Sequence, residues 1–169
     1  MLYKQLQFTT GWFGKLMFKF DSKIDIRFDD VIGYDAQKIK LRQAISKILN
    51  NQESKPKGII IKGPEGTGKT FMAKAFIGEA QMPYMIIFGG EVKSATDIKR
   101  IFSVARLKKS CIIFFDEFDA LASGELLDPR VRGTMLTQLD DQDTLRNPNT
   151  KVLFMAATNY YEKLDEAMI

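Results

Sequence analysis

The sequence has no histidine, and Cys111 is its only cysteine. Without histidine, these residues cannot form a catalytic Ser-His or Cys-His pair, a histidine-ligated zinc site or the HExxH helix of a zinc protease. A lone cysteine cannot form an internal disulfide, which favours a reducing compartment, and its place at the head of an apolar run predicts a buried, unreactive thiol. The sequence also has no apolar stretch close to the ~20 residues that a membrane-spanning helix needs.

The composition is otherwise that of an ordinary globular domain. Hydrophobic residues make up 45% of the 169 residues and charged residues 27%, and this length suits one domain better than two. The formal charge of +4 arises from 25 basic and 21 acidic residues that are spread along the chain. Because the excess is small and dispersed, it does not favour a nucleic-acid partner.

Residues 1–27 show no sustained hydrophobic period. Aromatic residues alternate with lysines, and the apolar positions are too interrupted for the hydrophobic core of a signal peptide. The pattern is typical of a linker or a poorly ordered terminus, and it also suits a segment that lies on a membrane surface or packs on another domain. We therefore separate residues 1–27 from a folded domain over residues 28–169.

Helical and strand patterns alternate along this domain. Apolar residues at helical spacing predict helices over residues 35–49, 69–80, 94–107, 129–139 and 163–169, with Ser94 or Thr96 as a cap. Short apolar runs predict buried strands over residues 58–62, 84–88, 111–115 and 152–157. Strands that alternate with helices favour right-handed crossovers and a parallel sheet, which is the α/β class.

The segment from Gly63 to Thr70 matches the phosphate-binding pattern G-x-x-x-x-G-K-[ST] at every position, between a predicted strand and a predicted helix. Glycines let successive N–H groups point at phosphate oxygens, and the helix that begins near Lys69 directs the positive end of its dipole at the same anion. Lys69 supplies a mobile charge for the β- and γ-phosphates, and Thr70 offers a hydroxyl to Mg²⁺. The predicted nucleotide contacts here are Gly63, Pro64, Glu65, Gly66, Thr67, Gly68, Lys69, Thr70 and Phe71.

Four apolar residues, 112–115, lead directly into Asp116 and Glu117. Burying a carboxylate costs free energy unless a cation accompanies it, so this placement indicates a function. Ligands of parallel sheets bind beyond the carboxyl ends of the strands, which is where both side chains emerge. We expect Asp116 to hold Mg²⁺, directly or through water, and Glu117 to polarise the water that attacks the γ-phosphate.

Five blocks of sequence, taken in order, resemble the AAA ATPases. They are Phe28–Gly33, Gly63–Thr70, Phe115–Ala120, Ala157–Asn159 and Leu164–Ala167. The resemblance implies that Val31 and Ile32 lie against the adenine, and that Asn159 is a polar sensor residue that positions the attacking water. It also implies a P-loop αβα architecture with strand order 5-1-4-3-2, and a ring, a homo-hexamer for example, that couples hydrolysis of ATP to ADP to the unfolding, remodelling or degradation of polypeptides.

Within that family, the chain is similar to the membrane-anchored AAA zinc proteases, the FtsH-like group. The similar residues are Pro56–Gly58, Ala73–Ala75, Gly78–Ala80 and Gln138-Leu139. This resemblance implies a location in the cytoplasm, or at the cytoplasmic or matrix-type face of a membrane. Residues 1–27 would then lie near that membrane.

The sequence departs from the family pattern in four places, one of which is the segment 124–128, which is short and lacks the family's usual arginine. Glu65 stands where the family has a small residue or proline, so its charge is expected to weaken phosphate binding. The segment 89–96 is short and lacks the aromatic-hydrophobic-glycine tip with which the family grips polypeptide. The sequence stops at Ile169, before the family's arginine fingers, fifth strand, helical lid and any protease domain. We therefore expect Ile59–Ile61 to lie at a sheet edge, and the isolated chain to bind ATP but hydrolyse it weakly.

Two other functions are open at this point. One is a nucleotide-binding or regulatory module that does not hydrolyse ATP, which the short segment and the missing arginines favour. The intact Asp116-Glu117 pair argues against it, because a site without hydrolysis has no use for a base. The other is a different P-loop class, such as a nucleotide kinase or a helicase, but the Asp116-Glu117 pair and Thr158-Asn159 fit the AAA pattern better.

Overall fold

The computed structural model describes residues 24–52, 56, 58–108, 110–122, 129–143 and 151–164. The long elements are α1 (Asp35–Leu49), β1 (Gly58–Lys62), α2 (Lys69–Ala80), β2 (Tyr84–Phe88), α3 (Ala95–Leu107), β3 (Ser110–Asp116), α5 (Pro129–Asp143) and β4 (Lys151–Thr158). The short ones are α4 (Phe118–Ala122) and the 3-10 helices η1 (Phe28–Asp30), η2 (Gly89–Glu91) and η3 (Tyr161–Lys163). No helix of this described part has the length and hydropathy to cross a membrane.

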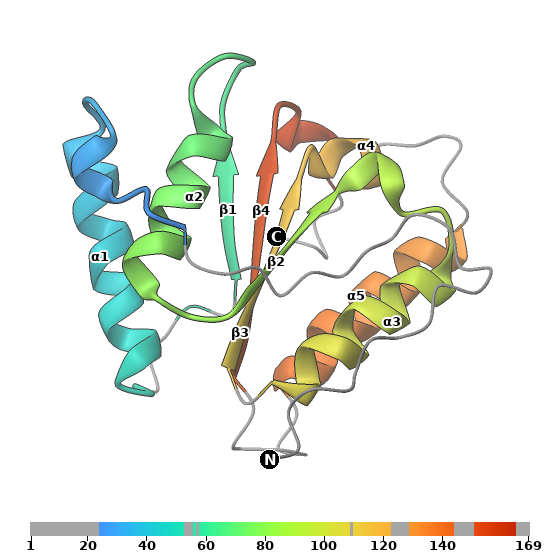
Figure 1. Ribbon diagram of the computed structural model, residues 1–169. Helices are drawn as coiled ribbons and strands as arrows, with labels where there is room; N and C mark the ends of the chain where they lie inside the picture. The colour runs from blue at the N-terminus through green and yellow to red at the C-terminus, as the bar shows by residue number, and fades with distance from the viewer. Residues whose placement is uncertain are drawn as a thin grey trace.

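The four strands form one parallel sheet in the order β1-β4-β3-β2 (Figure 1). Since β4 pairs with both β1 and β3, the last of the described strands lies in the middle of the sheet. This is the predicted α/β class and the predicted order of these four strands. Among the described strands β1 lies at one edge, and Ile59–Ile61 on it are half-buried.

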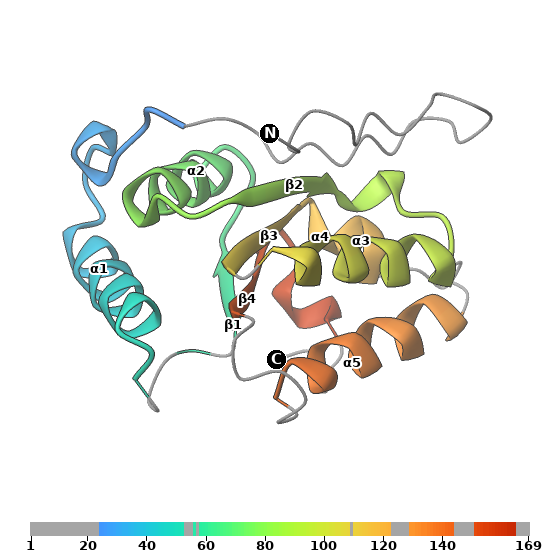
Figure 2. The ribbon, with the colours of Figure 1, turned by 60° about the horizontal axis from the view of Figure 1, so that its bottom comes forward.

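Helices cover both faces of the sheet, which gives three layers (Figures 1 and 2). α1 and α2 pack on one face, and α3 and α5 on the other. Successive side chains of β3 alternate between the two cores: Ile113 and Phe115 join the α3–α5 side, and Ile112 and Phe114 join the α1–α2 side. Because both faces are covered, the strand is an unbroken apolar run, as is usual for parallel sheets.

The predicted strands and the first four predicted helices are present, with different ends in a few places. α5 continues to Asp143, four residues past its predicted end, because polar residues extend it after the apolar period stops. Ser94 caps α3, as one of the two predicted alternatives, by accepting a hydrogen bond from the Asp97 N–H. α4 was not predicted, since a helix of five residues is too short to show a period. Most of the helix expected over 163–169 lies outside the described residues.

The chain before η1 is packed against the domain. Ile24 and Ile26 contact the core beneath α1 and α2. Gly78 in α2 allows this approach, because a Cβ there would collide with the Ile26 carbonyl oxygen. Residues 24–27 are therefore packed like the domain that follows them, whereas residues 1–23 lie outside the described part.

Candidate functional site

The loop between β1 and α2 lies at the carboxyl end of the sheet. Gly66 (φ +76°) and Gly68 (φ +81°) adopt the left-handed conformation that favours glycine. Gly68 is also the N-cap of α2 and, as a glycine, has no side chain to cap the N–H groups of that helix end. The first turn of α2 contains no acidic residue either, so its positive end is left for an anion. In α3, by contrast, Ser94 and Asp97 occupy the same helix end.

Hydrogen bonds within the loop fix its shape. The Thr67 hydroxyl and the Lys69 ammonium group each donate to the Pro64 carbonyl oxygen, at 2.7 Å in both cases. The Tyr34 hydroxyl donates to the Thr67 carbonyl oxygen at 3.2 Å, which connects the segment before α1 to the loop. Glu65 is exposed at the turn. Sequence reasoning missed Tyr34, because no pattern signals a contact across 33 positions.

Two motifs far apart in the sequence meet at Thr70 and Asp116. Thr70 lies in the first turn of α2, and Asp116 is the last residue of β3. The Thr70 hydroxyl lies 3.0 and 2.9 Å from the two carboxylate oxygens of Asp116 and donates to them. Asp116 is 7% exposed and also accepts a hydrogen bond from the Glu117 N–H at 3.1 Å. The buried carboxylate therefore lies next to the positive end of α2.

This hydroxyl–carboxylate pair fits Mg²⁺, which prefers hard oxygen ligands. The described residues contain no group of three or more His, Cys, Asp or Glu side chains that could hold a metal alone. Such a sparse set matches the usual binding of Mg²⁺ by one or two protein oxygens together with substrate phosphates and water.

Glu117 leaves the sheet where β3 ends and turns the chain into α4. Its backbone is left-handed (φ +51°), and its side chain is exposed. Gly89, at the end of the neighbouring strand β2, packs directly against it: a Cβ at position 89 would collide with the Glu117 carbonyl oxygen. Gly89 was not among the predicted site residues. The glycine pair after β2 gives a signal for a turn, but not for this contact.

Asn159 follows β4, the strand between β1 and β3. It is therefore placed between the phosphate loop, which follows β1, and the acidic pair, which ends β3. Its backbone N–H donates to the Asp119 carboxylate at 3.0 Å. The phosphate loop, the acidic pair and Asn159 therefore lie together at the carboxyl end of the sheet, although they come from distant parts of the chain.

The two residues expected against the adenine differ in exposure. Val31 is 7% exposed and its side chain packs in the core under α1 and α2, whereas Ile32 is 95% exposed. Lys38 donates to the Val31 carbonyl oxygen at 3.0 Å and so anchors this segment. Of the two side chains, only that of Ile32 is open to a ligand. Phe71, in the first turn of α2, is 41% exposed.

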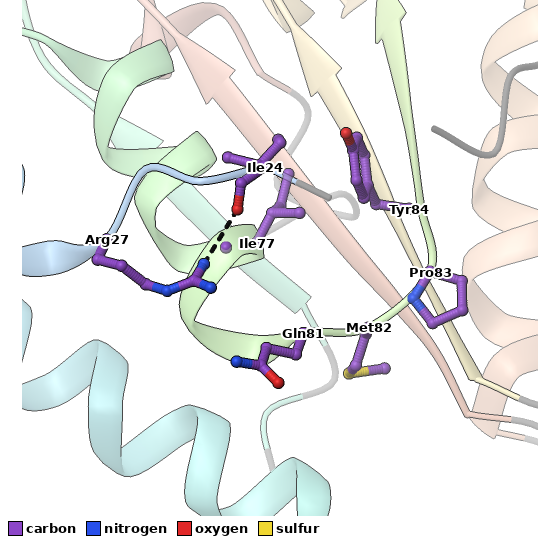
Figure 3. Close-up of a pocket in the computed structure, with 8 residues that line it drawn as sticks. Ile24, Arg27, Ile77, Gln81, Met82, Pro83 and Tyr84 are labelled. Atoms are coloured by element: carbon purple, nitrogen blue, oxygen red, sulfur yellow. Dashed lines mark hydrogen bonds between the residues drawn. The ribbon is translucent and has the colours of Figure 1, made fainter. Parts of the chain in front are cut away.

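A pocket of about 520 Å³ lies elsewhere, at the carboxyl end of α2 (Figure 3). It is lined by the segment before η1, the last turn of α2 and the start of β2, and the Arg27 guanidinium donates to the Ile24 carbonyl oxygen at its wall. α2 has 12 residues and so separates this pocket from the phosphate loop by about 18 Å along the helix axis. The pocket is not part of the candidate site.

The chain is similar to known proteins in its family pattern and in its sequence. Residues 59–169 match the model of the ATPase family associated with various cellular activities (AAA). The chain is 32% identical to the rat ATP-dependent zinc metalloprotease YME1L1, over 88% of this chain and 24% of that protein. It is 37% identical to the 26S proteasome regulatory subunit 7 homolog of Schizosaccharomyces pombe, over 90% of this chain and 39% of that protein. The chain therefore spans less than half of the length of either relative.

Solved structures show the same similarity. The AAA domain of FIGL-1 in complex with ADP superimposes with a TM-score of 0.74 at 30% identity, over 87% of this chain and 53% of that chain. A chain from a study of katanin self-assembly gives a TM-score of 0.70, also at 30% identity, over 86% and 50% of the two chains.

Proposed function

Because the chain belongs to the AAA family of ATPases, we propose that it binds Mg²⁺ and ATP at the loop 63–70 and hydrolyses the ATP to ADP and phosphate. One observation carries this proposal. The Thr70 hydroxyl lies 2.9 and 3.0 Å from the Asp116 carboxylate oxygens, which joins the phosphate loop to the acidic pair in one site.

The loop and α2 would bind the phosphates. Backbone N–H groups of the loop, the uncapped end of α2 and the Lys69 ammonium group all present positive charge to the same region. In this structure Lys69 donates a hydrogen bond to the Pro64 carbonyl oxygen, which is neutral. When ATP binds, a negatively charged phosphate oxygen would take the place of that acceptor and form a stronger hydrogen bond. Exposed Ile32 and the segment around Val31 would lie at the base end of the nucleotide, since Tyr34 connects this segment to the loop.

Thr70 and Asp116 would hold the Mg²⁺, through an oxygen or an ordered water. When bound, the ion supplies positive charge to the phosphate oxygens. Glu117 is the proposed general base: its exposed carboxylate accepts a proton as the oxygen of a water molecule bonds to the γ-phosphorus, while the bond from that phosphorus to the ADP oxygen breaks. Asn159, placed between the two motifs, would orient the water.

The complete protein is proposed to act as a ring on polypeptides. The supporting observations are the relatives, which are named as a zinc metalloprotease and a proteasome regulatory subunit, and the study of katanin self-assembly. In many phosphoryl-transfer sites a second protein chain supplies an arginine that stabilises the transition state and raises kcat roughly 10³–10⁵-fold. Turnover in the isolated chain is therefore expected to be slow. From the resemblance to the FtsH-like group, we propose a location in the cytoplasm, or at the cytoplasmic or matrix-type face of a membrane.

Titration with a fluorescent ATP analogue and Mg²⁺ tests the binding step. Lys69→Ala should abolish saturable binding, whereas Lys99→Ala, which removes the same charge from the exposed face of α3, should leave it unchanged. Equal binding by the two variants would contradict a working phosphate loop.

Phosphate release tests hydrolysis. Glu117→Gln removes the base but not the phosphate contacts, so it should bind the analogue normally and lose turnover. The short segment 89–96, which lacks the aromatic-hydrophobic-glycine tip, favours the second function, a nucleotide-binding module that does not hydrolyse ATP. That function predicts that the wild type and Glu117→Gln release phosphate at the same background rate even when the protein is assembled.

A further inference from the structure

The Asp119 carboxylate, in α4, forms hydrogen bonds with the end of β4. Asp119 Oδ1 accepts a hydrogen bond from the Thr158 hydroxyl at 2.9 Å and another from the Asn159 N–H at 3.0 Å. The Thr158 hydroxyl oxygen accepts a third, from the Tyr160 N–H, at 3.1 Å. The last residue of β4 and the two residues that follow it are therefore fixed, directly or through one hydroxyl, by a residue about 40 positions earlier in the sequence.

The local backbone explains how Asp119 reaches this position. β3 and β4 are neighbours in the sheet, with Phe115 opposite Ala156, so both chains leave the sheet side by side. The left-handed turn at Glu117 ends β3 and starts α4 at once. Asp119 is the second residue of α4, half-buried against the end of β4. The Thr158 side chain is 1% exposed, so its hydroxyl has to be satisfied by the protein.

We propose that Asp119 is a positioning residue, which sets the backbone of Asn159 and so holds its side chain in a fixed relation to Glu117. The inference rests on the proposed ATPase function and deepens it. A hydrogen bond from a backbone N–H to a carboxylate is stronger than one to a neutral oxygen. Because Asp119 lies two residues after Glu117, the base and the water-orienting residue move as one unit. Displacement of either by about 1 Å would cost on the order of 10²-fold in rate.

The first test uses ¹⁵N-resolved NMR of the full chain, since it does not depend on turnover. Addition of Mg²⁺ with ATP should shift the amides of Gly66 and Gly68, and the Asn159 side-chain NH₂ signals should differ between the ATP and ADP complexes. In Asp119→Ala, the glycine amides should still shift, and the ATP–ADP difference at Asn159 should disappear. Asp119→Asn keeps an acceptor oxygen and should restore that difference, which a general loss of folding would not allow.

The outcomes separate the two proposals. No shift of Gly66 and Gly68 in the wild type would overturn ATP binding, and this inference with it. Glycine shifts in both proteins, with an unchanged ATP–ADP difference at Asn159 in Asp119→Ala, would overturn the inference alone. Loss of the glycine shifts in Asp119→Ala would also overturn it, because the residue would then be needed for binding.

Turnover gives a second readout. Asp119→Ala should lower kcat about 10- to 100-fold with the ATP Kd within about twofold of wild type. Asp140→Ala, which removes a carboxylate from an exposed position on α5, is the matched control and should turn over at the wild-type rate. A kcat for Asp119→Ala equal to that of this control would contradict the positioning role.

Discussion

Gly89→Ala should slow hydrolysis without weakening ATP binding. A Cβ at this position would come well inside 3.0 Å of the Glu117 carbonyl oxygen, a separation that real Cβ atoms essentially never show, and within 3.3 Å of the Leu121 N. The obstacle is backbone on both sides, so no flexible side chain can give way. Glu117 or the end of β2 has to move by about 1 Å to reach an ordinary contact distance of 3.4 Å or more.

Two effects of different size follow from that movement. Overpacking of this kind costs roughly 1–3 kcal/mol of stability. A displacement of about 1 Å at the proposed base costs on the order of 10²-fold in turnover. The phosphate loop lies at the other end of the site, after β1, so the Kd for the ATP analogue should stay within about twofold of the wild-type value if each site acts independently.

Gly90→Ala is the matched control, because a Cβ at position 90 meets no atom within 4 Å. It should be neutral, or stabilising by up to ~1 kcal/mol through a less flexible unfolded chain. Denaturant unfolding, analogue titration and phosphate release should be measured on both variants. The reasoning is refuted if Gly89→Ala matches Gly90→Ala in stability and turnover.

Three further predictions concern single side chains. Tyr34→Phe removes the hydroxyl that bonds to the phosphate loop and should weaken binding of the ATP analogue about two- to tenfold, as expected for one hydrogen bond; an unchanged Kd would show that the bond does not shape the loop. Arg42 bonds to Asp29 and Glu79, which raise the pKa of its guanidinium, so Arg42→Ala should lower the Tm by an amount that shrinks as salt is added; a salt-independent change would contradict an ionic cause. Burial raises the pKa of the Cys111 thiol to about 12, so thiol reagents at pH 8 should label it only on unfolding. Because the pKa of this thiol lies near its ordinary value of 9.0 in the unfolded chain and at about 12 in the folded one, stability should fall as pH rises between these values; fast labelling of the native protein would refute the argument.

The fold was predictable wherever a local pattern is long enough. α1 and α2 show helical spacing over several turns and have the predicted ends, and β1 and β2 are apolar runs with the predicted ends. α4 and the 3-10 helices could not be predicted, because three to five residues do not complete a period. The strand order came from the family resemblance, since strands that never adjoin in sequence carry no local signal of which pairs form.

The candidate site, like the fold, could be predicted only in part from the sequence. Gly63–Thr70 and the pair Asp116-Glu117 were predicted from residue type and spacing, and the structure brings them together through the 2.9 Å contact of Thr70. Val31 and Ile32 were predicted as a pair, yet only tertiary packing shows that one side chain is buried and the other is 95% exposed.

The sequence by itself determined which chemical groups the site contains. A glycine-rich loop with lysine and threonine, followed by a strand that ends in two carboxylates, carries its chemistry in the residues themselves, because each part works over a few adjacent positions. Only the tertiary structure decided which residues contact these groups. Tyr34 donates a hydrogen bond to the phosphate loop, Gly89 packs against Glu117, and Asp119 accepts a hydrogen bond from the Asn159 N–H. These contacts join positions that are 28 to 40 residues apart in the chain. The last two exist because β3 pairs with both β2 and β4, and a local sequence pattern cannot specify which strands become neighbours.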